Sequence, residues 1–424
     1  MSTAELFMTP EEIPNFVSET LADYDLYCYW EDEGAPEYGV APYITFYLYH
    51  SEDEFLEVAH EIIELYQELQ TLIDRPFQRV YNNKTENWVK ATPEKLGREM
   101  LREHAKLCYK TDPQELLDGS IGYFNKYYDI KATSEESPVG SARWAFAADV
   151  RGWYSGGNFS HYTTIKITFR DGWYRDNNQQ VWRNFITKWL HRLKPEHCYS
   201  GYEVGSATVG VMGAYESDVM ERICADHFYG LDVDHPGKMG YNDHDDEDGY
   251  INYAHLGAGI RTPTWCFLLS PLWRNKLGKS VEEVKEALAH PDIRVTEIPY
   301  PEDKHNPAGE PALWIELGEL DLYPVDKGVP GLPVLANALI KPVRCNLLQL
   351  YTLDPWAGDP NPRFDEENSP RWMARFDPDS EWPDPDLPGF FVPRRFRDGL
   401  ELINLFVPFW PPVAGSCNPS WSAA

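Results

Sequence analysis

The chain has 424 residues, of which 68 are acidic and 38 basic, so its formal net charge is −30. Such a surface repels nucleic acid and anionic membranes, and it attracts basic partners. Hydrophobic residues make up 42% of the chain and aromatic residues 14%, which is enough for a packed interior and excludes disorder of the whole chain. The length exceeds what one hydrophobic core usually serves, so two lobes are expected.

The cysteines and the N-terminus predict the compartment. The seven cysteines are widely spaced and no two of them form a CxxC pair, so neither a disulfide framework nor a structural zinc site is expected. Most should be small buried hydrophobes. Residues 1–15 lack a basic region followed by an apolar run, and no window approaches the roughly 18 apolar residues that a membrane span needs. We therefore expect a cytoplasmic protein without a signal peptide.

The first regular elements are a strand followed by a helix. Residues 43–49 are rich in aromatic and β-branched side chains, which is typical of a strand. Ser51 and Glu54 have the spacing of a capping box at the start of a helix. Apolar side chains then recur at three- and four-residue steps, which predicts a core-facing stripe. They are Phe55, Val58, Ala59, Ile62, Ile63, Tyr66, Leu69 and Ile73.

A second strand and helix follow the same plan. Residues 163–169 alternate between apolar and polar side chains, as a half-buried strand does. Residues 176–193 predict a helix that ends before Pro195. Its core-facing side chains should be Val181, Phe185, Trp189 and Leu193. Whether the two units are a true duplication or a chance similarity of a common plan stays open.

The remaining elements alternate between helix and strand. They are a helix over residues 217–228, a strand over 265–269, a helix opened by a capping box at Ser280 and Glu283, paired strands over 293–298 and 313–317, and a short helix over 332–340. No βαβ pattern is clear enough to require a parallel sheet. The predicted fold class is therefore α+β, with mixed or antiparallel sheets and packed helices.

The composition changes after Cys345. Residues 354–393 contain nine prolines and many acidic side chains, a composition that favours extended backbone without its own core. Large rings nevertheless punctuate this stretch, so we expect it to wrap over the body with the rings in surface grooves. They are Trp356, Trp372, Phe376, Trp382, Phe390 and Phe391. The expected divisions are an N-terminal lobe over residues 1–150, a second lobe over 151–345 and this extension over 346–424.

The densest polar cluster lies in residues 243–248. Counted from His244, Gly249 occupies the sixth position of an EF-hand loop, but the first ligand is then a histidine and the twelfth position is His255. The calcium pattern thus fails at both ends. A solvated loop, a surface that meets a basic partner and, least favoured, a cation site remain as interpretations.

Other polar constellations are weak. Six side chains of metal-binding type lie within thirty residues, but no helical spacing joins two of them as ligands. They are His227, Asp232, Asp234, His235, His244 and His255. Acid pairs such as Glu316 and Glu319 are expected from abundance alone in so acidic a chain. No nucleophile, phosphate-loop or dinucleotide motif occurs, so no catalytic residue, metal or cofactor is predicted.

Four short segments carry a family resemblance. They read Gly-Leu-Asp-Val at residues 230–233, Ile-Arg-Thr-Pro-Thr-Trp at 260–265, Leu-Gly at 277–278 and Leu-Ile-Lys-Pro-Val-Arg at 339–344. In order and spacing they resemble the bacterial type VI secretion immunity proteins of the TsiV-like family, which are often paired with VRR-type nuclease effectors. The resemblance covers residues 42–344. The acidic insert at 241–253 and the tail after Cys345 depart from the family pattern.

The resemblance implies a cytoplasmic immunity protein that binds a secreted toxin and covers its active site. If the toxin is a nuclease, its groove is basic, and an acidic surface competes for it. We assign a toxin-binding surface to the acidic insert: Tyr241, Asp243, Asp245, Asp246, Glu247, Asp248 and Tyr250. Two alternatives remain. One is a hydrolase that reverses a modification installed by the toxin, and the other is a non-catalytic adaptor that uses its proline-rich tail.

Overall fold

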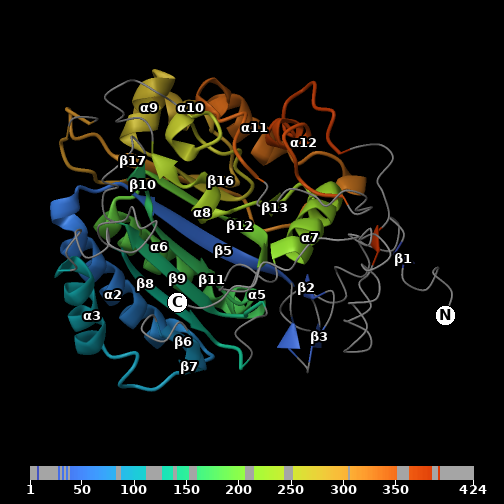
Figure 1. Ribbon diagram of the computed structural model, residues 1–424. Helices are drawn as coiled ribbons and strands as arrows, with labels where there is room; N and C mark the ends of the chain where they lie inside the picture. Colours follow the sequence, from blue (N-terminus) through green and yellow to red (C-terminus); the bar gives the residue numbers. More distant parts are fainter. Residues whose placement is uncertain are drawn as a thin grey trace, which may run out of the picture.

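The computed structural model describes residues 7–8, 27–28, 31–32, 35–36, 39–82, 87–110, 127–136, 141–151, 160–205, 214–242, 252–303, 306–350, 362–383 and 390–391. One large open sheet dominates these ranges, with helices packed around it (Figure 1). Neighbouring strands along the sheet are antiparallel, which makes the fold α+β, as predicted.

The strands are ordered β16 (Ile293–Ile298), β17 (Ala312–Leu317), β15 (Cys266–Leu269), β12 (His197–Gly205), β5 (Gly39–Leu48), β11 (Thr163–Thr168), β9 (Ala145–Arg151), β8 (Tyr127–Thr133), β6 (Arg79–Asn82) and β7 (Asn87–Lys90). The short strand β13 (Leu231–Asp232) adds in parallel to β12, and β2 (Tyr27–Cys28) adds to β5. Strands from both sides of residue 150 therefore share one sheet.

Within the described ranges, three two-stranded ribbons accompany the large sheet. They are β1 (Phe7–Met8) with β18 (Phe390–Phe391), β3 (Glu31–Asp32) with β4 (Ala35–Pro36), and β10 (Ser160–His161) with β14 (Tyr241–Asn242). The first of them joins a segment near the start of the chain to one near its end.

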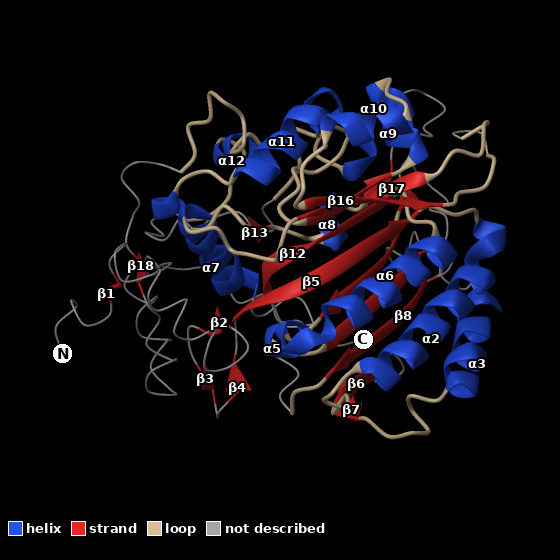
Figure 2. Cartoon of the chain, turned by 180° about the vertical axis from the view of Figure 1, so that it is seen from behind, coloured by secondary structure: helices blue, strands red, loops and turns tan. Residues whose placement is uncertain are grey.

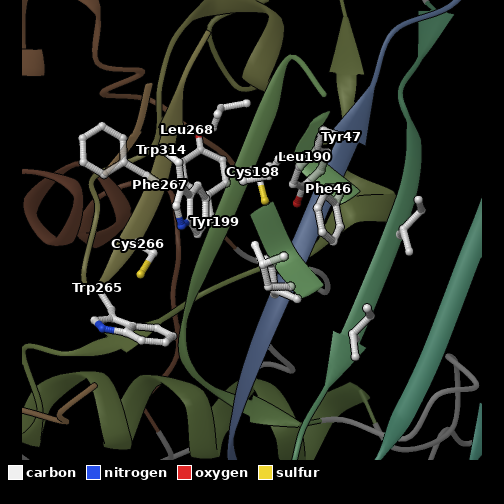
Figure 3. Packing of buried hydrophobic residues seen from close by; sticks show 14 of the residues in the cluster. Phe46, Tyr47, Leu190, Cys198, Tyr199, Trp265, Cys266, Phe267, Leu268 and Trp314 are labelled. Atoms are coloured by element: carbon white, nitrogen blue, oxygen red, sulfur yellow. The ribbon is translucent and has the colours of Figure 1, made fainter. Parts of the chain in front are cut away.

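One face of the sheet is apolar and lies under three long helices. The helices are α2 (Phe55–Leu72), α3 (Arg98–Lys110) and α6 (Gln179–Leu193), which run across this face in Figure 2. The ring of Tyr66 on α2 lies 4.9 Å, between centroids, from that of Phe146 on β9. Figure 3 shows the same cluster continuing across neighbouring strands, with Phe46, Cys198 and Cys266 in its interior.

The opposite face of β5 and β12 carries polar and aromatic side chains. Tyr43, Thr45 and Tyr47 alternate with the apolar residues of β5, and Tyr199 and Glu203 occupy the same face of β12. All five are buried. A polar layer inside the protein must find internal hydrogen-bond partners.

The remaining helices flank the sheet. Four of them gather beside the β15–β17 end in Figure 1: α9 (Pro271–Leu277), α10 (Val281–Ala287), α11 (Gly331–Ile340) and α12 (Asn368–Met373). The others are α5 (Asp171–Trp173), α7 (Ala214–His227), α8 (Pro236–Met239) and the short turns η2 (Glu52–Glu54), η3 (Tyr174–Asn178), η4 (Leu256–Ala258), η5 (Val325–Lys327) and η6 (Lys341–Val343).

The strand predictions at residues 43–49, 163–169 and 265–269 are confirmed by β5, β11 and β15. The paired strands near residues 293 and 313 are confirmed as well, since β16 and β17 lie side by side. The expectation that residues 163–169 are only half buried was wrong. Thr164 and Thr168 are also buried, because α-helices cover one face and the polar layer is itself covered.

The second long helix differs from its prediction at its start. Asn177 has a positive φ of 65°, which breaks the helix, so α6 begins at Gln179 instead of residue 176. Val181 was expected in the core and is 43% exposed. Its neighbour Trp182 is buried and stacks on Phe185, because the buried face is rotated by one residue at this end.

The two predicted capping boxes have different outcomes. At α10, Ser280 Oγ accepts the Glu283 N–H, and the Glu283 carboxylate accepts the Ser280 N–H, so this box is confirmed. At α2, the Glu54 carboxylate accepts the Ser51 N–H at 2.7 Å, but Ser51 Oγ donates to the same carboxylate instead of accepting from the helix. Only half of that box forms, and η2 precedes the helix.

Part of the proline-rich extension is helical. Residues 368–373 form α12, so the expectation of extended backbone was wrong there. Trp372, Phe376 and Trp382 are buried, and Trp382 Nε1 donates to the carbonyl of Ala225 on α7 at 3.2 Å. Trp356 and the side chains of Phe390 and Phe391 lie outside the described part of the chain.

The described cysteines match their prediction. Cys198, Cys224, Cys266 and Cys345 are buried, Cys108 is half-buried, and none of these five forms a disulfide. Across the described ranges, no helix has both the length and the apolar composition that crossing a membrane would need.

Candidate functional site

Two of the segments that carry the family resemblance meet on the polar face of the sheet. Asp232 comes from residues 230–233 and Arg261 from residues 260–265, and both side chains are fully buried beside β5. The guanidinium of Arg261 contacts the Tyr43 hydroxyl, lies 3.5 Å from Asp232 Oδ2 and stacks over the Tyr199 ring at 4.3 Å. Arg261 therefore joins a loop to both central strands.

Asp234 is the most strongly bound carboxylate of this cluster. It accepts hydrogen bonds from Thr45 and Tyr47 at 2.6 Å each and from Arg261 at 2.7 Å. Burial alone would raise the pKa of Asp234, but Lys166, Arg261 and these hydroxyl donors outweigh it and lower the pKa to about 2. Asp234 is therefore ionised throughout the physiological range. Its negative charge is compensated inside the protein by Arg261, Lys166 and the hydroxyl donors.

Asp232 has weaker compensation. It accepts hydrogen bonds from Thr264 at 2.7 Å and from Tyr43 at 2.9 Å, and Arg375 lies 3.9 Å away. Burial raises the pKa of Asp232 even though Arg261 and Arg375 oppose the shift. Burial also lowers the pKa of Arg375 to about 9. The separation of 3.9 Å is too long for a direct hydrogen bond, so this pair is loosely coupled.

Lys166 and Glu203 extend the cluster toward the surface. Lys166 Nζ lies 2.5 Å from the Glu203 carboxylate and 3.4 Å from that of Asp234, and its side chain is 23% exposed. Burial raises the pKa of Glu203 to about 8, with Lys166 opposing and Asp234 reinforcing the shift. The single ammonium of Lys166 cannot fully compensate both carboxylates. Asp234, which has additional hydrogen-bond donors, stays ionised, while Glu203 takes up a proton more readily.

The last resemblance segment, residues 339–344, is hydrogen-bonded to the loop that carries Arg261. Ile260 donates its N–H to the carbonyl of Val343 at 2.9 Å, and Cys345 donates its N–H to the carbonyl of Ile260. Arg344 makes a two-point hydrogen bond to the Asp377 carboxylate at 2.8 and 2.9 Å. Backbone hydrogen bonds thus join residues 339–344 to the loop that carries Arg261.

The predicted toxin-binding residues are only partly visible. Tyr241 lies in β14, opposite His161 of β10. Its ring packs between two imidazoles, 3.6 Å from that of His161 and 4.4 Å from that of His255. Burial, with Arg151 and His255, lowers the pKa of His161 to about 3, so this imidazole is neutral near pH 7.

Tyr241 is engaged in ring contacts within the described part of the chain. Its half-buried ring is held between the imidazoles and is not presented as an isolated anchor. The remaining members of the predicted surface lie outside the described residues. They are Asp243, Asp245, Asp246, Glu247, Asp248 and Tyr250.

The possible metal ligands that the structure describes are dispersed. Asp232 and Asp234 bind Arg261, His235 contacts the Glu221 carboxylate at 2.8 Å, and His255 stacks on Tyr241. Among the described residues, no three His, Cys, Asp or Glu side chains are grouped as a metal site. Glu316 is also occupied, since it accepts from Arg183 at 2.9 Å.

A groove of about 470 Å³ lies at one end of the sheet, where several connections converge. We call it the acidic groove. It is lined by the end of β5, the first turns of α2, the turn between α6 and β12, the start of α9 and the loop after β16. Its carboxylates are Glu54, Glu57, Glu61, Glu196, Glu302 and Asp303. They come from distant segments, so no local sequence pattern identifies them.

The fold has a counterpart among solved structures. A structure titled Pseudomonas aeruginosa T6SS protein PA0821 superimposes with a TM-score of 0.57 and 14% sequence identity, over 92% of this chain and 95% of that chain. At this identity the likeness is one of fold. No family model matches the chain, and no curated protein is similar to it in sequence. The TsiV-like resemblance therefore stays a prediction, while the fold is shared with a type VI secretion system protein.

Proposed function

We propose that this chain is an immunity protein that binds a secreted antibacterial toxin inside the producing cell and occludes the toxin's active site. The observation that carries the proposal is that three of the four resemblance segments, residues 230–233, 260–265 and 339–344, meet around the Arg261 loop. Segments scattered over residues 230–344 share a location because they build the same interior. The shared fold with a type VI secretion system protein supports the same assignment.

A function in binding, without catalysis, agrees with the internal hydrogen bonds of the carboxylates around Arg261. Catalytic acids and bases must reach a substrate, whereas Asp234 has its oxygens engaged by Thr45, Tyr47 and Arg261. Asp232 is equally enclosed. What the chain offers to a partner is its surface, and a net charge of −30 favours rapid encounter with a cationic protein.

The proposal is tested by stoichiometry. Candidate secreted effectors from neighbouring genes are co-expressed with the chain, and the activity of any effector that co-purifies is titrated with increasing amounts of the chain. An occluding protein abolishes the activity at a fixed molar ratio, with an endpoint that does not move with incubation time. Protection at strongly substoichiometric dose, or no complex with any of these effectors, would contradict the proposal.

A second candidate function, a hydrolase acting on a toxin-modified target, is favoured by one observation. Lys166 and Glu203 form a close pair whose carboxyl has a pKa raised to about 8, and such pairs occur at active sites as well as in structural networks. The two functions are distinguished with Lys166→Met. If the pair is catalytic, this variant keeps its complex with the effector but loses protection, whereas an occluding protein loses protection only when it loses the complex.

A further inference from the structure

The acidic groove has walls from different parts of the chain. Glu54 ends η2, and Glu57 and Glu61 lie in the first turns of α2. Glu302 and Asp303 belong to the loop after β16. Glu196 lies in the turn before β12. The two walls are far apart in sequence, so the fold is what brings their carboxylates to one opening.

The charges of the groove are only partly compensated from within. Among the described lining residues, the lysine and arginine side chains are those of Arg192 and Lys194. Arg192 pairs with Glu61 at 2.6 Å, and the Tyr162 hydroxyl contacts Glu196. Within the described ranges, Glu57 and Glu302 are exposed and have no ion-pair partner. One uncompensated carboxylate therefore lies on each of the two walls.

A buried hydroxyl also lines the groove without a partner. Ser270 is 2% exposed, and its Oγ forms no hydrogen bond. It occupies the N-cap position of α9, where a serine side chain usually accepts a backbone N–H, but this one does not. A buried polar atom without a partner is uncommon in folded proteins, and a ligand donor reaching it would satisfy it.

We propose that the acidic groove binds a basic segment of the partner protein, with lysine or arginine side chains between Glu57 and Glu302 and one donor reaching Ser270 Oγ. Guanidinium and ammonium groups are donors without acceptor capacity, which suits a site made of carboxylates and an unsatisfied hydroxyl. The inference rests on the proposed function in so far as the partner is the toxin. It assigns contact to described residues outside the predicted acidic insert.

The groove is tested directly with a fluorescein-labelled tetra-arginine peptide, followed by anisotropy at low and at near-physiological salt. Glu57→Gln/Glu302→Gln should weaken peptide binding by about tenfold at low salt, roughly threefold for each exposed ion pair lost. The matched control is Glu282→Gln/Glu286→Gln, which removes the same charge from exposed positions on α10. Equal weakening by the two double variants would overturn the proposal, because it would mean that only total charge matters.

Ser270→Ala supplies a second readout. Because Ser270 Oγ has no partner in the protein alone, its removal should leave the melting temperature unchanged within error, while peptide affinity falls several-fold. A loss of melting temperature with unchanged peptide affinity would show instead that the hydroxyl serves the fold, and would remove it from the site.

Neutralisation assays with candidate effectors from neighbouring genes separate this proposal from the proposed function. If the wild-type chain neutralises such an effector and Glu57→Gln/Glu302→Gln does so with equal affinity, the groove is not the contact surface, while the immunity function stands. The opposite result is that the wild-type chain neutralises no effector, while Glu57→Gln/Glu302→Gln weakens peptide binding and the control variant does not. The immunity function then fails, and the groove remains a site for basic segments.

Discussion

Arg261 shows how a single residue organises this fold. It is fully buried, and it reaches Asp232, Asp234 and Tyr43 from a loop that has no regular structure of its own. A buried arginine is tolerated only where carboxylates and hydrogen-bond acceptors surround it. In the sequence, an arginine among apolar and threonine residues gave no sign of this role, because its partners lie on distant segments.

Replacing Arg261 with methionine should strongly destabilise the protein. The substitution leaves Asp232 and Asp234 buried without their shared cation, and breaking such a pair costs about 3–5 kcal/mol. Urea denaturation measures the loss. The control is Arg294→Met, since Arg294 is 53% exposed and lies 3.7 Å from Glu316, so it should cost under about 1 kcal/mol. Similar losses for both variants would contradict the role assigned to Arg261.

Glu203 predicts a pH dependence of stability. Its carboxyl pKa is raised from 4.5 to about 8, so the folded state holds the proton more tightly than the unfolded state does. The protonated Glu203 carboxyl therefore stabilises the folded state relative to the unfolded state. This stabilisation is fully present below pH 4.5 and is lost as the pH rises to about 8. The Glu203→Gln variant keeps the size and shape of the side chain but has no carboxyl group that can ionise.

The unfolding free energy of Glu203→Gln relative to the wild-type chain should therefore increase between about pH 5 and about pH 9. Chemical denaturation at both pH values measures the difference. A constant difference across this window would mean that Lys166 compensates the ionised carboxylate fully, and the expected dependence would be absent.

At the scale of elements, the apolar periodicity predicted where strands and helices occur. β5 and α2 were predictable because aromatic and β-branched residues precede a regular stripe of core positions. The kink at Asn177 was not predictable, because asparagine is one of several residues that adopt positive φ and the local sequence does not indicate which of them does so. The acidic groove was not predictable either, since its walls meet only through strand order.

Gly230 illustrates a motif residue whose role becomes visible in the fold. A side chain at this position would place its Cβ 2.3 Å from the carbonyl oxygen of Asp321 and 2.7 Å from that of Leu322. Gly230 also donates its N–H to Leu322 at 2.7 Å, so the two backbones cannot separate without losing that bond. The glycine permits a close approach between β13 and the chain before η5.

Gly230→Ala should therefore destabilise the protein by about 2 kcal/mol or more, as overpacking of a rigid site does. Gly237→Ala is the matched control, because its Cβ would meet nothing within 4 Å and it lies in α8. The control should be neutral or slightly stabilising. Thermal melting of both variants provides the measurement, and equal melting temperatures would show that the backbone at Gly230 yields easily.

At the scale of the whole molecule, the extension after residue 345 belongs partly to the interior. Trp372 and Arg375 are fully buried, and the carbonyl of Met373 accepts a hydrogen bond from Thr262, a member of the Arg261 loop. Arg344 and Lys341 both bind Asp377. Deleting everything after residue 353 would therefore damage the fold itself, and a loss of partner binding after that deletion would not identify an adaptor tail.

Two truncations separate these effects. A chain ending at residue 361 loses Trp372, Phe376 and Trp382 from the core, and since removing one large buried aromatic costs about 3–5 kcal/mol, it should not fold stably. A chain ending at residue 383 keeps all three rings and should melt close to the full-length protein. Circular dichroism and size-exclusion chromatography compare the two.

The longer truncation then tests the adaptor alternative cleanly. If the chain ending at residue 383 binds and neutralises the effector as the full-length protein does, the contact surface lies on the folded body, where the acidic groove is found. If it stays folded but loses the effector, residues after 383 make the contact, and an adaptor that works through its tail becomes the better account. A folded chain ending at residue 361 would instead show that the buried rings contribute far less than their burial implies.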